Sequence, residues 1–410
     1  MIAKAVRLLL RGGHAYWAWL AFLAVLIVWG ALAYVEQLRS GLIVTNMRDQ
    51  VSWAFYIGNF TFLVGVASAA VVLVIPAYVY DWGPIKEIAI LGEILAISAI
   101  IMSLLFVVAD MGHPERFWHL LPGLGRLNFP QAILAWDVVV LNLYLVLNVA
   151  IVGYVLGCGI LGKHYNARIV HPLVFASIPA ALSIHTVTAF IYTGFAGRPY
   201  WSSAILAPRF ICSAFCSGPA IMLVLLQVLQ RTTKIAVKDE AIWKIAELMA
   251  YAMFLNLFML GAEVFTEVYG GTAHSIHVRY LFVGVQGHDT LVPFAWAAVA
   301  SGVVSLVLLA VPRTRRNFFT LNLGCMLVYA SVYIEKGMGT IVPAFTPDTL
   351  GEIYEYAPTL TELRIGAGIF GVGFLVFTLL CKIAIPIMTG ELARPPLWHP
   401  EVHAGASNAG

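Results

Sequence analysis

The sequence has 410 residues, of which 61% are hydrophobic and only 11% are charged. Soluble domains carry about 25% charged residues, so a chain this apolar cannot cover its own surface in water. The formal net charge of +3 is too small to indicate nucleic acid binding. We therefore expect an all-α integral membrane protein, because a helix pairs its own backbone groups inside hydrocarbon.

Apolar segments long enough to cross a bilayer, for which about 20 residues are needed, occupy most of the chain. The first is too long for a signal-peptide core and is expected to be a retained spanning helix. Residues 1–390 are predicted to form one polytopic membrane domain, and the Pro-rich tail 391–410 is predicted to be disordered. The ten predicted spans lie near residues 14–37, 51–80, 86–110, 131–157, 171–195, 203–230, 243–267, 289–311, 318–336 and 362–388.

The distribution of Lys and Arg predicts the orientation. Of the 24 basic residues, 15 fall on the side of the predicted amino terminus, leaving 24 − 15 = 9 elsewhere. Because basic loops stay inside, both termini are expected in the cytoplasm of a bacterial or archaeal cell, and the loops 111–130, 268–290 and 337–361 outside. The 15 residues are Lys4, Arg7, Arg11, Lys86, Lys163, Arg168, Arg231, Lys234, Lys238, Lys244, Arg313, Arg315, Arg316, Lys382 and Arg394.

A weak internal repeat is visible. Span 2 reads FTFLVGVASAAVVLVIPAYV from Phe60, and span 6 reads FICSAFCSGPAIMLVLLQVL from Phe210. The following spans each carry an acid near their start, Glu93 and Glu247. This pattern predicts two related four-helix bundles, spans 2–5 and 6–9, with two peripheral helices.

Polar residues inside spans are candidates for function, because an ionisable group there costs about 2.5–3.5 kcal/mol on insertion scales. Two acids, Glu93 and Glu247, lie toward the predicted cytoplasmic ends. The others lie toward the predicted external face: Asn59, Asp110, Asp137, His185, Arg209, Glu263, Glu267 and Glu335.

Each of these groups also has a structural explanation, which the sequence leaves open. Asp137 and Arg209 could form an ion pair that joins two helices, and His185 could be an interhelical hydrogen bonder. Glu263 and Glu267 are near enough to the interface to be hydrated. The two acids toward the cytoplasm could extend their carboxylates to water.

The histidines and cysteines argue against a redox centre held by this chain. Of eleven histidines, only His185 lies well inside a span, whereas a bis-histidine haem needs two facing ligands. The five cysteines form no C-x-x-C pattern, so no metal site is predicted. Any electron transfer would need a partner that holds the metal.

Several segments are similar to one family. The stretch DMGHPERFW from Asp110, the helix SIHTVTAF from Ser183 and the block APRFICSAFCSG after Trp201 resemble motifs of the NrfD/PsrC family, the quinone-interacting membrane subunits of iron–sulfur oxidoreductases. The opening AYWAWLAF and the run VSWAFYIGNFTFLVGVA are similar to its DsrP branch, in the sulfite-reductase-associated complex DsrMKJOP. The resemblance covers nearly the whole chain.

The resemblance implies a site for menaquinone or ubiquinone near the periplasmic face. Shorter family members have a quinone-binding His in span 2, where this chain has Phe60 or Thr61, so His185 is the expected substitute and is expected to be catalytic together with Asp110. The expected quinone-binding residues are Asn59, Tyr56, Asp110, His185 and Arg209. The expected proton-transfer residues are Asp137, Glu263, Glu267, Glu93 and Glu247.

The resemblance also implies partners. These are a periplasmic ferredoxin-like iron–sulfur subunit similar to DsrO, a multihaem cytochrome c and further membrane and cytoplasmic subunits, serving sulfur metabolism and proton translocation. From the residues alone, a secondary transporter is the alternative, because internal repeats and polar residues at mid-membrane suit that class. Matching Gly- or Pro-broken helices in both repeats would favour it, and Pro76 and Pro219 do not coincide in the repeat.

Overall fold

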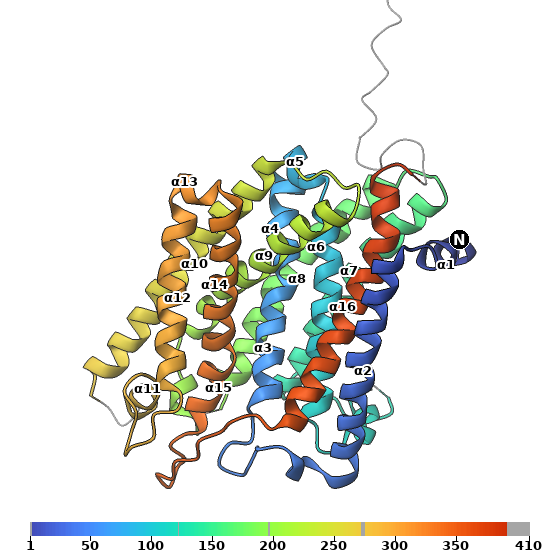
Figure 1. The fold of residues 1–410 in the computed structure, drawn as a ribbon. Coiled ribbons are helices and arrows are strands. Elements are labelled where there is room, and N and C mark those ends of the chain that lie inside the picture. Colours follow the sequence, from blue (N-terminus) through green and yellow to red (C-terminus); the bar gives the residue numbers. More distant parts are fainter. Residues whose placement is uncertain (1, 122, 196, 272–274, 392–410) are drawn as a thin grey trace, which may run out of the picture.

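The structure is a computed structural model that describes residues 2–121, 123–195, 197–271 and 275–391. Within these residues, ten helices are long and apolar enough to cross a membrane, which confirms the predicted all-α membrane fold (Figure 1). The spans are α2 (His14–Ser40), α3 to η2 (Phe55–Val79), α6 (Ala89–Asp110), α7 (Ile133–Ile160), α8 (Ala167–Thr193), α9 (Leu206–Thr232), α10 (Asp239–Tyr269), α12 (Val292–Ala310), α14 with α15 (Phe318–Phe345) and α16 (Leu360–Met388). Almost all of the predicted tail, from residue 392, lies outside the described residues.

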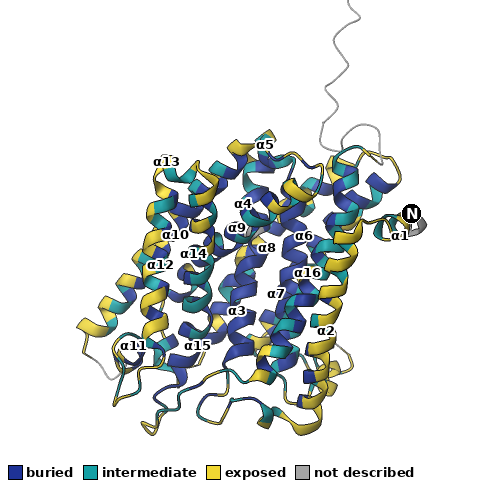
Figure 2. Ribbon diagram, viewed as in Figure 1, coloured by how far each residue is buried: buried dark blue, intermediate teal, exposed yellow. Residues whose placement is uncertain are grey.

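The helix α3 (Phe55–Ala67) forms the centre of the molecule. All of its side chains are buried, and it packs against α6, α9 and α14 (Figure 2). By contrast, α2 and α12 expose large apolar side chains such as Trp29 and Trp296. This pattern is expected where lipid surrounds the outer helices and protein surrounds the inner one.

The contacts between helices fall into two groups. The helices α3, α6, α7 and α8 contact one another in succession, as do α9, α10, α12 and α14. Contacts of α9 with α3 and α8 join the groups, and α16 packs on α2 and α6. The relation of the two groups by a repeat stays a prediction.

Two spans are interrupted. The second breaks at Ser68, continues as α4 (Ala69–Val74) and ends in the π-helical turn η2 (Ile75–Val79). The ninth breaks at Gly337, between α14 (Phe318–Lys336) and α15 (Met338–Phe345). The predicted end of span 9 at residue 336 coincides with the end of α14, and the apolar segment after Gly337 extends the span as α15, which is helical and buried.

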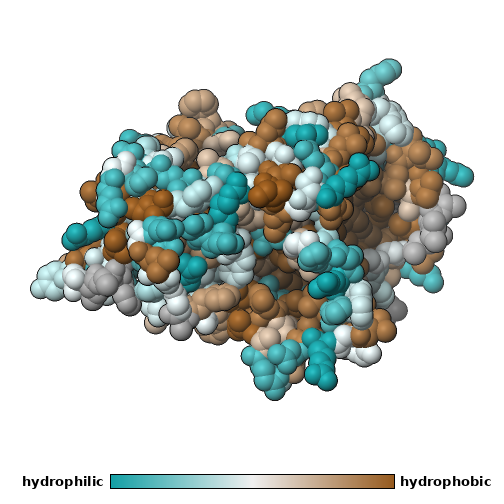
Figure 3. Space-filling model, turned by 90° about the horizontal axis from the view of Figure 1, so that it is seen from below, coloured by the Kyte–Doolittle hydropathy of each residue, from teal (hydrophilic) through white to brown (hydrophobic). Residues whose placement is uncertain are grey.

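The short elements mark the two faces of the bundle. The amino terminus, α5 (Gly83–Lys86) and α13 (Pro312–Arg315) lie at one end, which we call the amino-terminal face (Figure 1). At the other end lie α11 (Ser275–Phe282) and α15, and we call this the α11 face. Viewed from below, hydrophobic side chains are exposed on the α11 face between hydrophilic ones (Figure 3).

Close packing of α2 on α16 depends on two glycines. A Cβ atom added to Gly30 would lie 2.6 Å from the Cα of Gly368 and 2.8 Å from the carbonyl oxygen of Arg364. Small residues allow such close approach of helices, and this packing drives helix association in lipid. We therefore expect this contact to hold α2 against the rest of the bundle.

Replacing Gly30 with Leu is expected to destabilise the protein by about 1–3 kcal/mol, the usual cost of overpacking. The matched control is Gly153→Leu in α7, where an added Cβ would meet nothing within 4 Å. The measurement is the melting temperature in detergent. Equal melting temperatures for the two variants would show that α2 does not depend on this contact.

Candidate functional site

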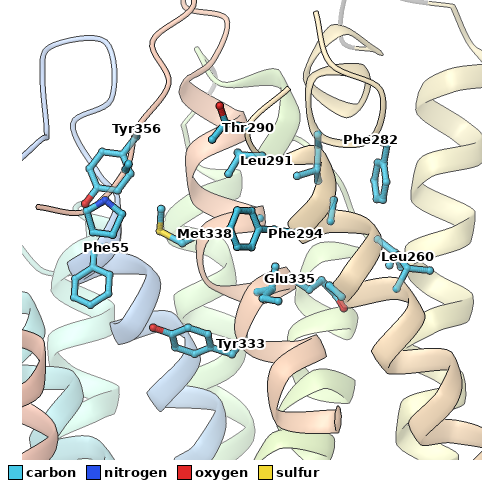
Figure 4. Close-up of a pocket in the computed structure, with 18 of the residues that line it drawn as sticks. Phe55, Leu260, Phe282, Thr290, Leu291, Phe294, Tyr333, Glu335, Met338 and Tyr356 are labelled. Carbon is cyan, nitrogen blue, oxygen red and sulfur yellow. The ribbon is translucent and has the colours of Figure 1, made fainter. Parts of the chain in front are cut away.

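A cavity of about 480 Å³ lies toward the α11 face, mainly among the helices of the second group, and Phe55 of α3 and the loop before α16 also line it. Apolar side chains from α3, α10, α11 and α12 form most of its wall. In Figure 4, Phe55 and Tyr356 form one side, Leu260 and Phe282 the other, and Phe294 lies between them. Because Phe294 is also 55% exposed, the cavity reaches the surface of the bundle. We call it the Arg209 cavity.

The polar edge of this cavity is an ion-pair cluster. The guanidinium of Arg209 donates from Nε and Nη2 to Oε1 of Glu335, at 2.9 and 2.8 Å. It also donates from Nη1 to Glu263. The other oxygen of Glu335 accepts from Nδ2 of Asn256 at 3.0 Å. Arg209 and Glu335 both line the cavity. The apolar space is therefore bordered by an ion pair whose opposite charges offset each other.

Local structure explains why the side chain of Glu335 lies in the interior of the helix bundle. It occupies the last turn of α14, and α15 continues the buried path after Gly337. Trp201 donates from Nε1 to the carbonyl oxygen of Thr340 at 2.8 Å, which fixes α15 against the segment before α9. Tyr200 donates to Gly339 at 3.1 Å, and burial raises the pKa of Tyr200 to about 12, so its hydroxyl remains a donor.

A second buried basic side chain, on the residue after Glu335, also joins α9 to α14. Lys336 is 2% exposed, and its Nζ donates to the carbonyl oxygen of Phe210 at 3.3 Å and lies 4.6 Å from the centre of that ring. A buried ammonium group is costly in hydrocarbon, so its retention indicates a role in function or in specifying the helix register.

Asn59 approaches the cavity indirectly. Tyr333, which lines the cavity, donates to Oδ1 of Asn59 at 3.1 Å, and Nδ2 of Asn59 donates to the carbonyl oxygen of Phe55 at 2.8 Å. The predicted residue is therefore behind Tyr333. It orients the phenol, which is the group that a ligand in the cavity would contact.

The loop before α16 closes one side of the Arg209 cavity. Tyr356 lines the cavity and donates to Glu362, which also accepts from the backbone of Asn46 at 3.0 Å and of Thr359 at 2.8 Å. Burial, and then the charge of Glu362, raise the pKa of Tyr356, so its hydroxyl stays protonated. The loop is thus held by a buried carboxylate.

The remaining predicted ligands do not line this cavity. Both ring nitrogens of His185 are buried and have no hydrogen-bond partner among the described residues. Tyr56 donates to Gln37 at 2.7 Å. One carboxylate oxygen of Asp110 is likewise buried without a partner in the described part of the chain. Asp137 accepts from Thr188 at 2.8 Å, and Arg209 pairs with Glu263 and Glu335 in place of the suggested Asp137.

The acids assigned to proton transfer occupy different environments. Glu93 is 2% exposed, and its Oε1 has no partner within the described ranges. Glu247 is only half-buried and accepts from Lys244 at 3.3 Å and from Tyr251 at 2.9 Å. A carboxylate that extends to water, the structural explanation considered for both acids, therefore fits Glu247 and does not fit the buried Glu93. Glu263 is buried against Arg209, whereas Glu267 is half-buried. The matching sequence positions of Glu93 and Glu247 therefore do not produce matching sites.

Part of the cluster is not evident from the sequence. Glu335 is polar but is predicted at the end of a span, and Asn256, Tyr333, Lys336 and Glu362 are not among the predicted site residues. One available signal is the apolar segment MGTIVPAF directly after Gly337, which indicates that Glu335 and Lys336 precede more buried helix. The roles of Asn256 and Tyr333 depend on helix rotation, which no local pattern reveals.

Comparison with known proteins places these features in a family. The family model described as "Polysulphide reductase, NrfD" matches residues 43–341, which include α3 through α14. The chain is 27% identical over 393 residues to a protein of Halobacterium salinarum that carries the provisional name of a dimethyl sulfoxide reductase membrane subunit, covering 87% of this chain and 88% of that protein.

Two further relatives carry quinones in their names. The Hdr-like menaquinol oxidoreductase integral membrane subunit of Archaeoglobus fulgidus is 21% identical over 385 residues, covering 90% of this chain and 93% of its own. The menaquinone reductase integral membrane subunit of Nitratidesulfovibrio vulgaris is 23% identical over 399 residues, covering 91% of this chain and 92% of that protein. By the extent of the family match, this chain belongs to the polysulphide reductase NrfD family of integral membrane proteins.

Proposed function

We propose that this protein is the quinone-reactive membrane subunit of a respiratory oxidoreductase complex, and that the quinone ring binds in the Arg209 cavity. The observation that carries the proposal is a cavity of about 480 Å³ whose wall is apolar except for Arg209, Glu335 and a few hydroxyl groups. Sites for small organic ligands combine such a wall with a few placed polar groups. The relatives named for menaquinol and menaquinone support the choice of ligand.

The residues at the polar edge suit quinol chemistry. Oxidation of a quinol to a quinone releases two electrons and two protons. Arg209 has N–H groups beyond those that its carboxylate partners use, and these can donate to a ring oxygen. The hydroxyl proton of Tyr333 is donated to Asn59, so its oxygen can accept from a quinol hydroxyl, and Glu335 can accept a proton as a general base. The electrons pass to a cofactor held by a partner subunit, and the reverse reaction uses the same groups.

The finer assignments are part of the proposal. We infer that the α11 face is periplasmic, because the basic residues gather at the other end. A DsrO-like iron–sulfur subunit would dock there, in a DsrMKJOP-like complex linked to sulfur metabolism, as the similarity of the opening AYWAWLAF and of the run VSWAFYIGNFTFLVGVA to the DsrP branch suggests. Among the proposed proton-transfer residues, Glu263 contacts Arg209 directly and is the first candidate after Glu335.

Two observations weigh against the transporter alternative. The second span breaks at Ser68, whereas α9, its counterpart in the repeat, continues from Leu206 to Thr232 through Pro219. The other break, at Gly337, falls in span 9. Transporters of this kind break corresponding helices in both repeats.

The test is menaquinol-dependent reduction of the partner's cofactor in the purified complex, together with extraction of bound quinone. For His185→Ala we expect a lower kcat and an unchanged KM, because His185 lies outside the cavity and can only move protons or support the helices around it. A large rise in KM and loss of bound quinone would instead place the ring between Asp110 and His185. A wild-type complex that neither contains nor oxidises a quinol would refute the proposed function.

A further inference from the structure

A second cavity, of about 450 Å³, lies deeper in the membrane than the first. Its wall is formed by α3, α6, α9, α14 and α16, and Figure 1 shows α3 between α14 and α16 in this region. Along α14, which runs toward the α11 face, the wall includes Met326 and Tyr329, whereas Tyr333 belongs to the first cavity. With a rise of about 1.5 Å per residue, Met326 lies about 10 Å deeper than Tyr333. We call this space the Tyr329 cavity.

The wall of the Tyr329 cavity offers almost nothing polar. Val66, Leu95 and Val224 represent its aliphatic part, and Phe374 its aromatic part. The hydroxyl of Ser98, which also lines it, is already used as a donor to the carbonyl oxygen of Ile94 at 3.0 Å. A ligand here would be held by apolar contact, so its chemistry must be that of a hydrocarbon chain.

Three aromatic rings lie between the two cavities. The ring of Phe62 lies 5.1 Å from the rings of both Tyr329 and Tyr333, and those two tyrosines are stacked at 5.7 Å. Phe62 and Tyr329 line the deep cavity, and Tyr333 lines the outer one. The two spaces therefore follow each other along one face of α14, separated by one helical turn of aromatic side chains.

The deep cavity also reaches lipid. Met326 is 59% exposed and Phe374 is 39% exposed, and both line it. A chain that entered from the Arg209 cavity could thus pass the tyrosines, cross the Tyr329 cavity and leave between α14 and α16 into the bilayer.

We propose that the Tyr329 cavity binds the isoprenoid tail of the same quinone whose ring occupies the Arg209 cavity, an inference that rests on the proposed function. An isoprenoid tail is a linear series of apolar units attached to the ring, so a polar outer site continued by an apolar inner site matches the two parts of the molecule. The protein then recognises tailed quinones by the tail as well as by the ring.

The test fills the deep cavity without touching the outer one. Val224 and Ile221 of α9 line the Tyr329 cavity and do not line the Arg209 cavity. The variants Val224→Phe and Ile221→Phe each place an aromatic ring in the Tyr329 cavity. The matched control is Val228→Phe, one turn further along α9, where the side chain is 48% exposed and lines neither cavity. The complete complex of each variant is assayed with a long-tailed menaquinol and with menadiol, which has the same ring and no tail.

We expect the cavity variants to raise the KM for the tailed menaquinol about tenfold, the effect of losing roughly two buried methylene groups, and to leave the KM for menadiol unchanged. Val228→Phe should change neither value. Bound quinone should fall in the purified cavity variants, while bound phospholipid stays constant.

Other results would overturn the inference. An unchanged KM for the tailed quinol in both cavity variants would place the tail elsewhere, and equal rises for both substrates would show a distorted ring site. Loss of bound phospholipid with quinone retained would identify the occupant as an acyl chain of a lipid. Failure of the wild-type complex to oxidise either quinol would refute the proposed function itself, and with it the tail site.

Discussion

Replacing Glu335 with Gln is expected to lower menaquinol oxidation by the complex about 100-fold, the usual effect of removing a general base. The amide has nearly the shape of the carboxylate and can still accept from Arg209 through its oxygen, but it cannot take up a proton from the ring. Arg209 retains its second partner, Glu263, so the cluster keeps a buried ion pair. The expected loss is therefore in kcat, with the complex still assembled.

The control for this variant is Glu240→Gln. Glu240 is exposed in the first turn of α10, at the amino-terminal end of the helix that carries Glu263. The same chemical change at that site should leave the rate of quinol oxidation unaltered. A Glu335→Gln complex that assembles and turns over at the wild-type rate would show that the cluster is only structural and that the ring binds elsewhere.

Replacing Arg209 with Met is expected to destabilise the folded protein by about 3–5 kcal/mol, because it leaves the carboxylates of Glu263 and Glu335 buried without their cation. The penalty arises from desolvated charge, not from lost volume, since Met fills much of the same space. The measurement is the melting temperature of the protein in detergent. Arg231→Met, at the exposed end of the same helix, should melt as the wild type does.

Rescue distinguishes charge from packing. The triple variant Arg209→Met, Glu263→Gln and Glu335→Gln contains no unpaired carboxylate in the cluster, so it should recover most of the lost stability while remaining inactive with menaquinol. If the triple variant melts as low as the single one, the arginine stabilises the bundle through its contacts and not through its charge.

Much of the fold could be predicted because a spanning helix is a local feature of the chain. Length and hydropathy, together with a low content of charged residues, decide whether a segment such as α6 or α12 crosses the bilayer. For the same reason, the polar residues within spans can be identified from the sequence, and Arg209 and Glu263 are among them. The ninth span shows the limit, because α14 does end before Gly337, and only the structure shows that α15 continues the span as buried helix.

The class of protein and its spans could be predicted from hydropathy along the chain, and the order of the ionisable groups along each span follows from their sequence positions. Their partners become visible in the folded bundle alone. Arg209 pairs with Glu263 and Glu335 and not with Asp137, and His185 lies outside the cavity that Arg209 lines. The physical reason is that contact between helices depends on their rotation and register, and these are set by packing over the whole bundle.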